Sequence, residues 1–250
     1  MPCLKIRLAE KNILASVFFD ETAELCKDYF SDFKIPDITI GVYEGDISRE
    51  RERSKADSLR KGTAYFEPSD GYLESLALYR KIAEALPEFN TVLFHGSAIA
   101  VDGEGYLFTA KSGTGKSTHA ALWRKMLGDR AVMINDDKPL IEITDSGATV
   151  YGTPWNGKHA LGTNIAVPLK AICILGRGEE NSISECVGIS EFPKMLSQTY
   201  TNSNPELVKK TMELVDKLLH RVKVYKLFCN VSPEAAEISF AKMKGNENEA

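Results

Sequence analysis

The chain has 250 residues, of which 43% are hydrophobic and 26% are charged, and its formal net charge is −4. This composition is typical of a globular protein with one large domain, or one domain and a smaller appendage. The acidic balance disfavours a general nucleic-acid binder, because such proteins carry a basic surface.

The five cysteines are scattered along the chain and include no C-x-x-C pair. We therefore expect a reducing compartment, with neither a disulfide framework nor a zinc site. No apolar run approaches the roughly 20 residues that a membrane helix requires, and the first residues lack the apolar core of a signal peptide. Together these features predict a soluble cytoplasmic protein without a membrane partner.

The N-terminal region, residues 1–90, is predicted to be a small α+β portion. Residues 3–20 fit two short strands, and residues 37–43 fit a third. The segment 47–62 mixes both signs of charge with almost no apolar spacing, which predicts a charged solvated loop or an exposed helix. A basic patch for an anionic partner is the alternative interpretation. Apolar residues at helical spacing predict a helix over 71–87.

From residue 91 to residue 250 the pattern predicts one compact catalytic domain. Ser97–Val101 and Tyr106–Ala110 fit the strands of a hairpin, because Asp102-Gly103-Glu104-Gly105 between them is a strong turn signal. The second of these strands leads directly into a glycine-rich loop. We expect a helix after the loop, from Ser117 to about Leu127.

The remaining elements predict an α/β fold in which a mixed sheet with β-hairpins is flanked by helices. In chain order they are a strand 131–134, a hairpin of 140–144 with 148–151, a polar loop 152–164, a strand 169–177, a helix beginning at Asn204-Pro205, a strand 222–228 and a last helix opened by Ser232. The tail 245–250 is expected to be disordered.

The glycine-rich loop fits the phosphate-loop (Walker A) pattern G-x-x-x-x-G-K-[ST], except that Ala110 stands at its first position. Gly113 and Gly115 permit backbone turns that aim N–H groups at an anion. Lys116 brings a positive charge to the β and γ phosphates, and the Ser117 hydroxyl can ligate Mg²⁺. The predicted nucleotide-binding residues are Ser112, Gly113, Thr114, Gly115, Lys116, Ser117 and Thr118.

A phosphate loop needs a carboxylate at the end of a neighbouring strand to complete its metal site. Asp136 and Asp137 occupy such a position, and one can hold the metal while the other takes the acceptor proton. We assign Ser117 and Asp137 to the metal, although the division of roles between the two acids stays open. The alternative is an Asp-Asp turn that merely opens the next hairpin. His95 either has a structural role or orients an aspartate and assists proton transfer.

The motifs FHGSAIAVDGEGYLFTAKSGTGKST and MINDDKP resemble the catalytic core of the HPr kinase/phosphorylase family. They are similar, more distantly, to ATP-dependent phosphoenolpyruvate carboxykinase. The resemblance covers about residues 91–177, and no N-K-x-D motif follows the loop, which disfavours a GTPase. It implies a P-loop kinase fold, ATP and Mg²⁺ as cofactors, and assembly as a homo-oligomer. The catalytic residues that it implies are His95, Lys116, Ser117, Asp136 and Asp137.

The segment beginning at His159 (HALGTNIAVPLKAICIL) resembles the signature segment of that family only loosely. The acidic residue and the arginine expected there are missing, and Lys158 and His159 stand nearby instead. This departure leaves the acceptor and any reverse phosphorylase reaction undefined.

The loop GTPWNGKH is the candidate for the acceptor side. Trp155 offers a flat apolar wall, Asn156 a directional hydrogen bond and Lys158 a positive charge. Arg177, at the end of a strand, can stabilise the transferring phosphoryl group in the same way. The alternative is a surface loop with a half-buried tryptophan.

Three hypotheses of function follow. The first is a Mg-ATP-dependent kinase that transfers the γ-phosphate to a hydroxyl, with serine in a protein, a peptide or a small molecule as the expected acceptor. The second is a carboxykinase-like lyase acting on a small acid, for which the chain is short and lacks an obvious set of arginines. The third is a non-catalytic ATP-binding switch or assembly factor, against which the intact lysine and aspartate pair argue.

Overall fold

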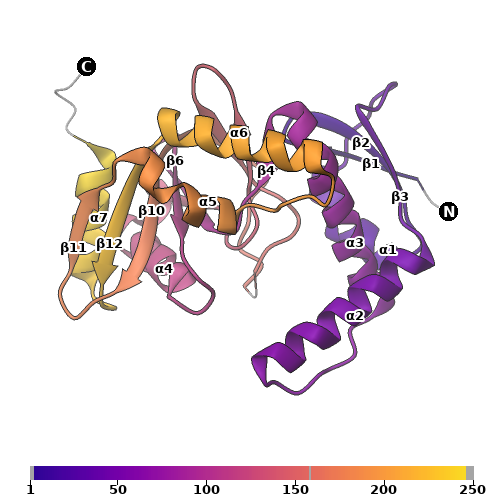
Figure 1. The fold of residues 1–250 in the computed structure, drawn as a ribbon, viewed down its shortest axis with the longest axis horizontal. Coiled ribbons are helices and arrows are strands. Elements are labelled where there is room, and N and C mark those ends of the chain that lie inside the picture. Colours follow the sequence, from indigo (N-terminus) through magenta and orange to yellow (C-terminus); the bar gives the residue numbers. More distant parts are fainter. Residues whose placement is uncertain (1–2, 158, 246–250) are drawn as a thin grey trace. The chain divides into compact units, whose positions relative to one another are not determined.

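A computed structural model describes residues 3–157 and 159–245 of the chain (Figure 1). The chain divides into two compact units, Met1–Ala85 and Leu86–Ala250, which we describe separately. Lys158 and, apart from Gly245, the tail expected to be disordered lie outside the described residues. Within the described part of the chain, every helix is too short or too polar to cross a membrane.

The first unit contains a three-stranded sheet in the order β1-β2-β3. β1 (Cys3–Leu8) pairs antiparallel with β2 (Lys11–Ser16), and β2 pairs in parallel with β3 (Ile38–Gly41). Alternate residues of β1 are buried, which is the pattern of a sheet with one covered face. The three predicted strands are confirmed.

Three α-helices complete the described part of this unit, and they are α1 (Asp20–Leu25), α2 (Glu44–Lys61) and α3 (Asp70–Ala85). α3 confirms the helix predicted over 71–87, except that its last turn continues as the 3₁₀ turn Leu86–Phe89. The segment 47–62 is helical up to Lys61, so within the first interpretation the exposed helix is correct and the charged loop is wrong. The alternative, a basic patch for an anionic partner, stays a prediction.

The physical reason for the helix at 47–62 is local. Asp46 accepts a hydrogen bond from the Tyr43 N–H at 2.9 Å, which caps the first turn. Ion pairs three residues apart then join successive turns of α2, as between Lys55 and Glu52 at 3.1 Å. Gly62 ends the helix in the left-handed conformation, with φ 64°. Charge pairing therefore supports a helix where apolar spacing was absent.

The second unit is built on a mixed sheet that is nine-stranded within the described residues. Its strands are β4 (Thr91–Leu93), β5 (Ser97–Val101), β6 (Glu104–Thr109), β7 (Ala131–Asn135), β8 (Leu140–Ile143), β9 (Ala148–Tyr151), β10 (Ala166–Arg177), β11 (Ser182–Glu185) and β12 (Lys223–Cys229). Seven of them follow the order β4-β8-β9-β10-β6-β5-β7, while β12 pairs with β10 and β11. The long strand β10 runs parallel to β6 and β12 and antiparallel to β9.

Both predicted hairpins are confirmed, β5 with β6 and β8 with β9. The turn between β5 and β6 is shorter than expected, because Glu104 and Gly105 already belong to β6. Asp102 and Gly103 have φ values of 52° and 85°, which suit a two-residue hairpin turn. This tight turn places β6 antiparallel to β5. The phosphate-binding segment, which follows β6, therefore leaves the sheet beside the start of β5.

The α-helices described in this unit are α4 (Lys116–Leu127), α5 (Phe192–Gln198), α6 (Pro205–Arg221) and α7 (Pro233–Lys244). The sequence predicted α4, α6 and α7, but neither α5 nor β11. Short 3₁₀ turns occur in this unit at Gly128–Arg130 and Gly188–Glu191, and one occurs in the first unit at Lys27–Tyr29. The unit is thus α/β, with helices flanking a mixed sheet.

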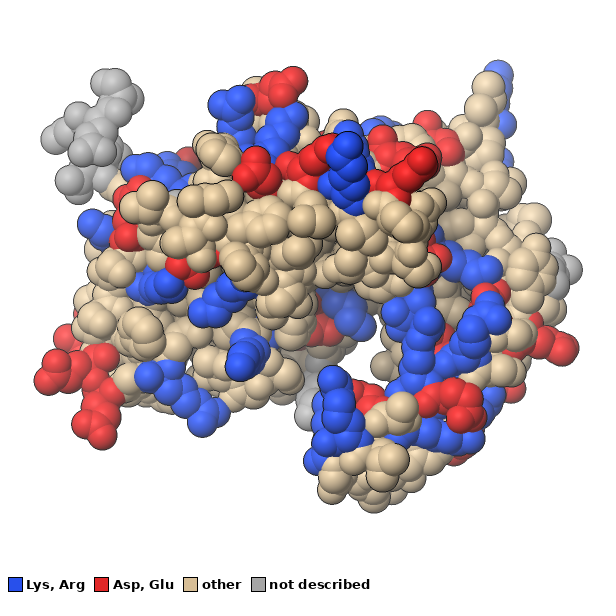
Figure 2. All heavy atoms as spheres, viewed as in Figure 1, with Lys and Arg blue, Asp and Glu red and all other residues tan. Residues whose placement is uncertain are grey.

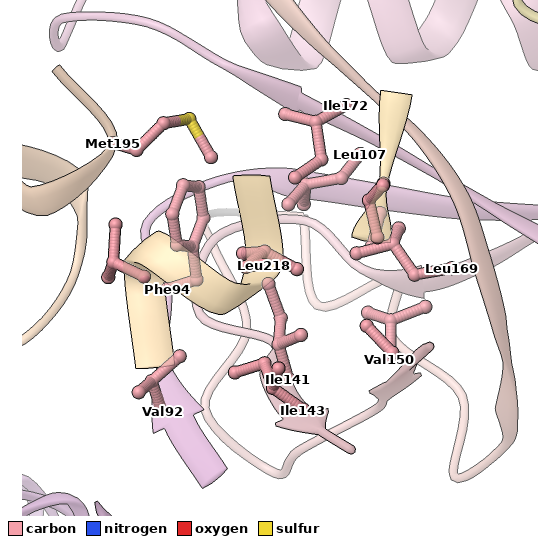
Figure 3. Packing of buried hydrophobic residues seen from close by; sticks show 14 of the residues in the cluster. Val92, Phe94, Leu107, Ile141, Ile143, Val150, Leu169, Ile172, Met195 and Leu218 are labelled. Carbon is pink, nitrogen blue, oxygen red and sulfur yellow. The ribbon is translucent and has the colours of Figure 1, made fainter. Parts of the chain in front are cut away.

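The two faces of this sheet carry separate hydrophobic clusters. Leu107 of β6 faces the cluster that contains Leu218 of α6, which Figure 3 shows from close by. Its neighbour Phe108 faces the other cluster, with Trp123 of α4. The indole N–H of Trp123 donates to the Ser239 hydroxyl at 2.8 Å, and this buried hydrogen bond joins α4 to α7. Side chains of β6 point alternately to the two faces of the sheet, and those on the face of Phe108 pack against α4. This packing fixes the position of α4 and of the phosphate-binding segment that precedes it.

Candidate active site around the phosphate loop

The loop between β6 and α4 has the backbone that anion binding requires. Gly113 and Gly115 have φ values of 79° and 125°, where any side chain would be strained. α4 begins immediately afterwards at Lys116, so its first N–H groups face the loop. Ala110 is not among the described residues with positive φ, and its methyl group packs in the core cluster beneath α4. Its place in the pattern therefore does not need glycine.

Lys116 is buried, with 8% of its surface exposed. Its ammonium group donates a hydrogen bond to the Ala110 carbonyl at 3.1 Å. Burial lowers the pKa of Lys116, and the negative charge of Asp137 opposes that shift. Lys116 forms no ion pair within 4.0 Å in the described residues, so a positive charge is held beneath the loop without a bound carboxylate.

Asn135, the last residue of β7, directs the two aspartates to different neighbours. Its side-chain oxygen accepts the N–H groups of Asp137 at 2.9 Å and Lys138 at 2.6 Å. Its amide nitrogen donates to the Thr153 hydroxyl at 3.0 Å, which ties the turn to the following loop. The Asp136 carboxylate accepts the Gly157 N–H at 2.5 Å and is almost completely buried. Sequence reasoning gave Asn135 no role, although it forms this turn.

His95 lies beside Asp137, with 3.5 Å between the Nε2 atom and a carboxylate oxygen. The Nδ1 atom is 3.1 Å from the side-chain oxygen of Gln198 on α5, an acceptor that fixes the ring proton on Nδ1. Burial and the charge of Lys116 lower the pKa of His95, against the opposing effect of Asp137. A neutral imidazole whose Nε2 lone pair faces Asp137 is the form favoured at neutral pH.

A cavity of about 410 Å³ opens on one side of the loop. It is lined by loop residues from Gly113 to Gly115, by His119 of α4, by Arg177 at the end of β10 and by the segment after β12. Arg177 donates a hydrogen bond to the Gly113 carbonyl at 2.7 Å. Arg177 therefore lies at the loop with the predicted nucleotide-binding residues, and we call this space the Arg177 cavity.

A second cavity of about 410 Å³ is lined by residues of α4, by Met133 of β7 and by the loop 152–164. The residues that matter for its chemistry are Ser117, Ala121, Arg124, Asp136, His159 and Leu161. Ser117 thus shares a cavity with Asp136, while Asp137 faces His95. Arg124 and Leu161 were not among the predicted site residues, because on the sequence they belong to an ordinary helix and an ordinary loop.

The residues predicted for the acceptor side are mostly turned away from this cavity. Trp155 is buried, with 4% of its surface exposed, which leaves little of its ring as a wall for an acceptor. The reason is Asn135, whose amide donates to the Trp155 carbonyl at 3.3 Å and holds this part of the loop inward. The amide group of Asn156 donates to the Thr153 carbonyl at 3.4 Å. Lys158 lies outside the described residues.

The donor set suits Mg²⁺. This ion prefers oxygen ligands and is commonly held by one or two carboxylates together with phosphate oxygens and water. Ser117 and Asp136 offer a hydroxyl and a carboxylate at the same cavity. Among the described residues, no three His, Cys, Asp or Glu side chains gather as a metal site of their own. The residues present therefore fit a metal shared with the phosphates of a nucleotide.

No protein-family model matches the chain, and no curated protein matches it. Among solved structures, the chain is similar to the Hpr(Ser) kinase/phosphatase from Coxiella burnetii, with 10% sequence identity and a TM-score of 0.35. The match covers 61% of this chain and 99% of that chain. A likeness of this size carries no conclusion about function, which has to be argued from the residues themselves.

Proposed function

We propose that this chain is a Mg-ATP-dependent phosphotransferase of the HPr kinase type, which transfers the γ-phosphate of ATP to a hydroxyl group. The observation that carries the proposal is the convergence of three segments far apart in sequence. The phosphate loop supplies Lys116, the segment before β5 supplies His95, and the end of β7 supplies the two aspartates. The Nε2 atom of His95 is 3.5 Å from a carboxylate oxygen of Asp137. Burial and the charge of Lys116 lower the pKa of His95, and burial lowers the pKa of Lys116 against the opposing charge of Asp137.

In this proposal the loop N–H groups and Lys116 hold the β and γ phosphates. A buried ammonium group without a carboxylate partner is well suited to a polyphosphate, because charge interactions are strong where water is excluded. Ser117 and Asp136 hold Mg²⁺, which when bound neutralises charge on the phosphate oxygens. The sequence assigned Asp137 to the metal. We assign Asp136 instead, because Asp136 lines the same cavity as Ser117.

The His95–Asp137 pair then accepts the proton of the acceptor hydroxyl. The hydroxyl oxygen forms a bond to the γ-phosphorus, the bond from that phosphorus to the bridging oxygen breaks, and ADP leaves. Gln198 holds Nδ1, so Nε2 is free to take the proton, and Asp137 stabilises the resulting imidazolium. The lowered pKa of His95 supports this role, because a base has to be unprotonated before the reaction.

The test compares the single variants Asp136→Asn and Asp137→Asn with the wild type. Transfer of label from γ-labelled ATP to a pool of hydroxyl-bearing small molecules and serine peptides should fall by at least about 10³-fold in each variant. ATP affinity, measured by calorimetry, should stay within about 10-fold of the wild type. Asp129→Asn is the matched control, because this exposed aspartate lies in the 3₁₀ turn after α4.

Full transfer in both variants would refute the proposal. ATP binding by the wild type without transfer to any acceptor would instead favour a non-catalytic switch. Formation of phosphoenolpyruvate from oxaloacetate and ATP would favour the lyase.

A further inference from the structure

We propose that the cavity beside Ser117 and Asp136 binds the acceptor, whose hydroxyl end extends past Asp136 to the adjacent Asp137 and its partner His95, and that Arg124 selects a small molecule carrying an anionic group as well as a hydroxyl. The anionic group is a carboxylate or a phosphate, since a guanidinium binds both through the same paired hydrogen bonds. This inference rests on the proposed phosphotransferase function and names the class of its acceptor. We call this space the acceptor cavity.

The first argument is position along α4. Ser117, Ala121 and Arg124 are spaced by four and three residues, so they lie on one face of the helix, and all three line the acceptor cavity. A rise of about 1.5 Å per residue separates the backbones of Ser117 and Arg124 by about 10 Å along the helix axis. Helical side chains lean towards the N-terminus, which brings the guanidinium back towards the loop. The acceptor hydroxyl and its anionic group are therefore expected to be separated by roughly 5–10 Å.

The second argument is the charge of Arg124. Its side chain is half-buried, and it makes no hydrogen bond or ion pair with any residue that the structure describes. Arg130, a few residues along, pairs with Asp102 at 3.1 Å. The carboxylate in the acceptor cavity, Asp136, is bonded to the Gly157 N–H and is not paired with Arg124. A partly desolvated guanidinium without a partner favours an anion supplied by the ligand.

The third argument is size and lining. A volume of about 410 Å³ lies within the range of about 300–1,000 Å³ typical of small-molecule sites. Apolar contacts come from Ala121, Met133 and Leu161, and polar groups come from Ser117, Thr118, Arg124, Asp136 and His159. The imidazole-bearing residue His159 is exposed. A short carbon chain that carries a hydroxyl and an anionic group fits this volume and this mixed lining.

The experiment uses the full chain with Mg-ATP and a set of matched probes. The carboxylate probe is ω-hydroxyhexanoate, the phosphate probe is hydroxybutyl phosphate, the neutral probe is ω-hydroxyhexanamide, and glycolate is too short to span the cavity. Each probe is measured for kcat/KM of phosphoryl transfer. Its binding is measured separately by calorimetry with a non-hydrolysable ATP analogue. We expect the longer anionic probes to exceed the amide by about 10-fold to 100-fold in both measurements.

The variant Arg124→Gln should bring the ratio of anionic to neutral probe close to one, and Arg124→Lys should restore part of it. Lys125→Gln is the control, because it removes the same charge from the next, exposed position of α4 and should leave the ratio unchanged. The carboxylate and phosphate arms then identify which anion the acceptor cavity prefers.

Equal use of the amide and the acid by the wild type would overturn the inference while leaving the phosphotransferase intact. Retention of the ratio in Arg124→Gln, or much better transfer to a neutral serine peptide, would overturn it as well. If no probe is phosphorylated, the binding measurement decides. Anion binding that is lost in Arg124→Gln supports the acceptor cavity without the proposed reaction, and the absence of binding refutes it.

Discussion

Asp46 and Glu50, two buried acids of the first unit, are paired with opposite charges, whereas the buried Lys116 of the second unit forms no ion pair with any described residue. Glu50 of α2 is 4% exposed and accepts hydrogen bonds from the Arg80 guanidinium at 2.5 and 3.0 Å. Asp46 pairs with Lys81 at 2.8 Å. Figure 2 shows cationic and anionic side chains side by side over the region of α2. Among the described residues, the ammonium group of Lys116 donates instead to a carbonyl oxygen, that of Ala110.

The pKa directions express the same difference. Burial by itself raises the pKa of Glu50, but Arg80 and Arg53 outweigh it, and the net pKa lies below the ordinary value. Burial lowers the pKa of Lys116, and no close carboxylate in the described residues reverses the shift. Removing one partner of a buried ion pair destabilises a fold because it leaves a buried charge uncompensated, whereas a buried lysine with a shifted pKa at a cleft is a candidate for binding an anionic ligand.

The largest expected effect is that of Lys116→Met. Loss of the ammonium group should reduce transfer by at least about 10³-fold and abolish stabilisation of the protein by Mg-ATP. The unliganded protein should be as stable as the wild type or more stable by about 1 kcal/mol, because an unpaired buried charge is removed. Thermal unfolding with and without Mg-ATP measures both effects. A large loss of stability in the unliganded variant would contradict the interpretation of Lys116 as an unpaired buried charge.

The converse variant is Glu50→Gln in the first unit. We expect the free energy of unfolding to fall by about 2 kcal/mol, because two arginines lose their buried partner. Urea unfolding is followed by far-UV circular dichroism, which reports both units, and by tryptophan fluorescence, which reports the second unit, where Trp123 and Trp155 lie. Only the dichroism should change. Glu52→Gln, in an exposed ion pair, should cost less than about 0.5 kcal/mol.

Acid should weaken the second unit before the first. Burial lowers the pKa of His119 from its ordinary value of 6.5 to about 4, so the folded state favours the neutral ring. The contribution of neutral His119 to the free energy of unfolding is complete above pH 6.5 and is lost as the pH falls from 6.5 towards 4. At pH 5 the free energy of unfolding is lower by about 2 kcal/mol. Since His95 shifts in the same direction, the measurement is the difference between wild type and His119→Gln in urea at pH 7 and pH 5. An equal loss in both proteins would refute the assignment.

The smallest expected effect is that of Arg177→Gln. Arg177 is exposed and donates to the Gly113 carbonyl at 2.7 Å, so it supports the loop from the side of the Arg177 cavity. An exposed cation near phosphates contributes about 1 kcal/mol or less, which corresponds to a twofold to fivefold loss of ATP affinity. Calorimetric titration with Mg-ATP measures it. A loss of 100-fold would instead give Arg177 a direct part in binding the transferred phosphate.

Local signals explain which elements could be predicted from the sequence. Turn residues and apolar periodicity predicted the hairpins and the helices α3, α4, α6 and α7. They missed α5, which has seven residues and no clear amphipathic pattern. They also missed Gln198, because its place beside His95 depends on the bridge between Phe94 and Thr199, residues that no local pattern connects.

The sequence by itself determined the chemistry of the loop: the two glycines, Lys116 and Ser117 are contiguous, and the conformation of such a segment depends on its own residues. Only the tertiary structure decided that Asp136 shares a cavity with Ser117, that Asp137 faces His95 and that Trp155 turns inward. The physical reason is that Asn135 bonds both to the turn after β7 and to the loop that follows β9. Hydrogen bonds between segments, rather than the order of residues within one, orient these side chains.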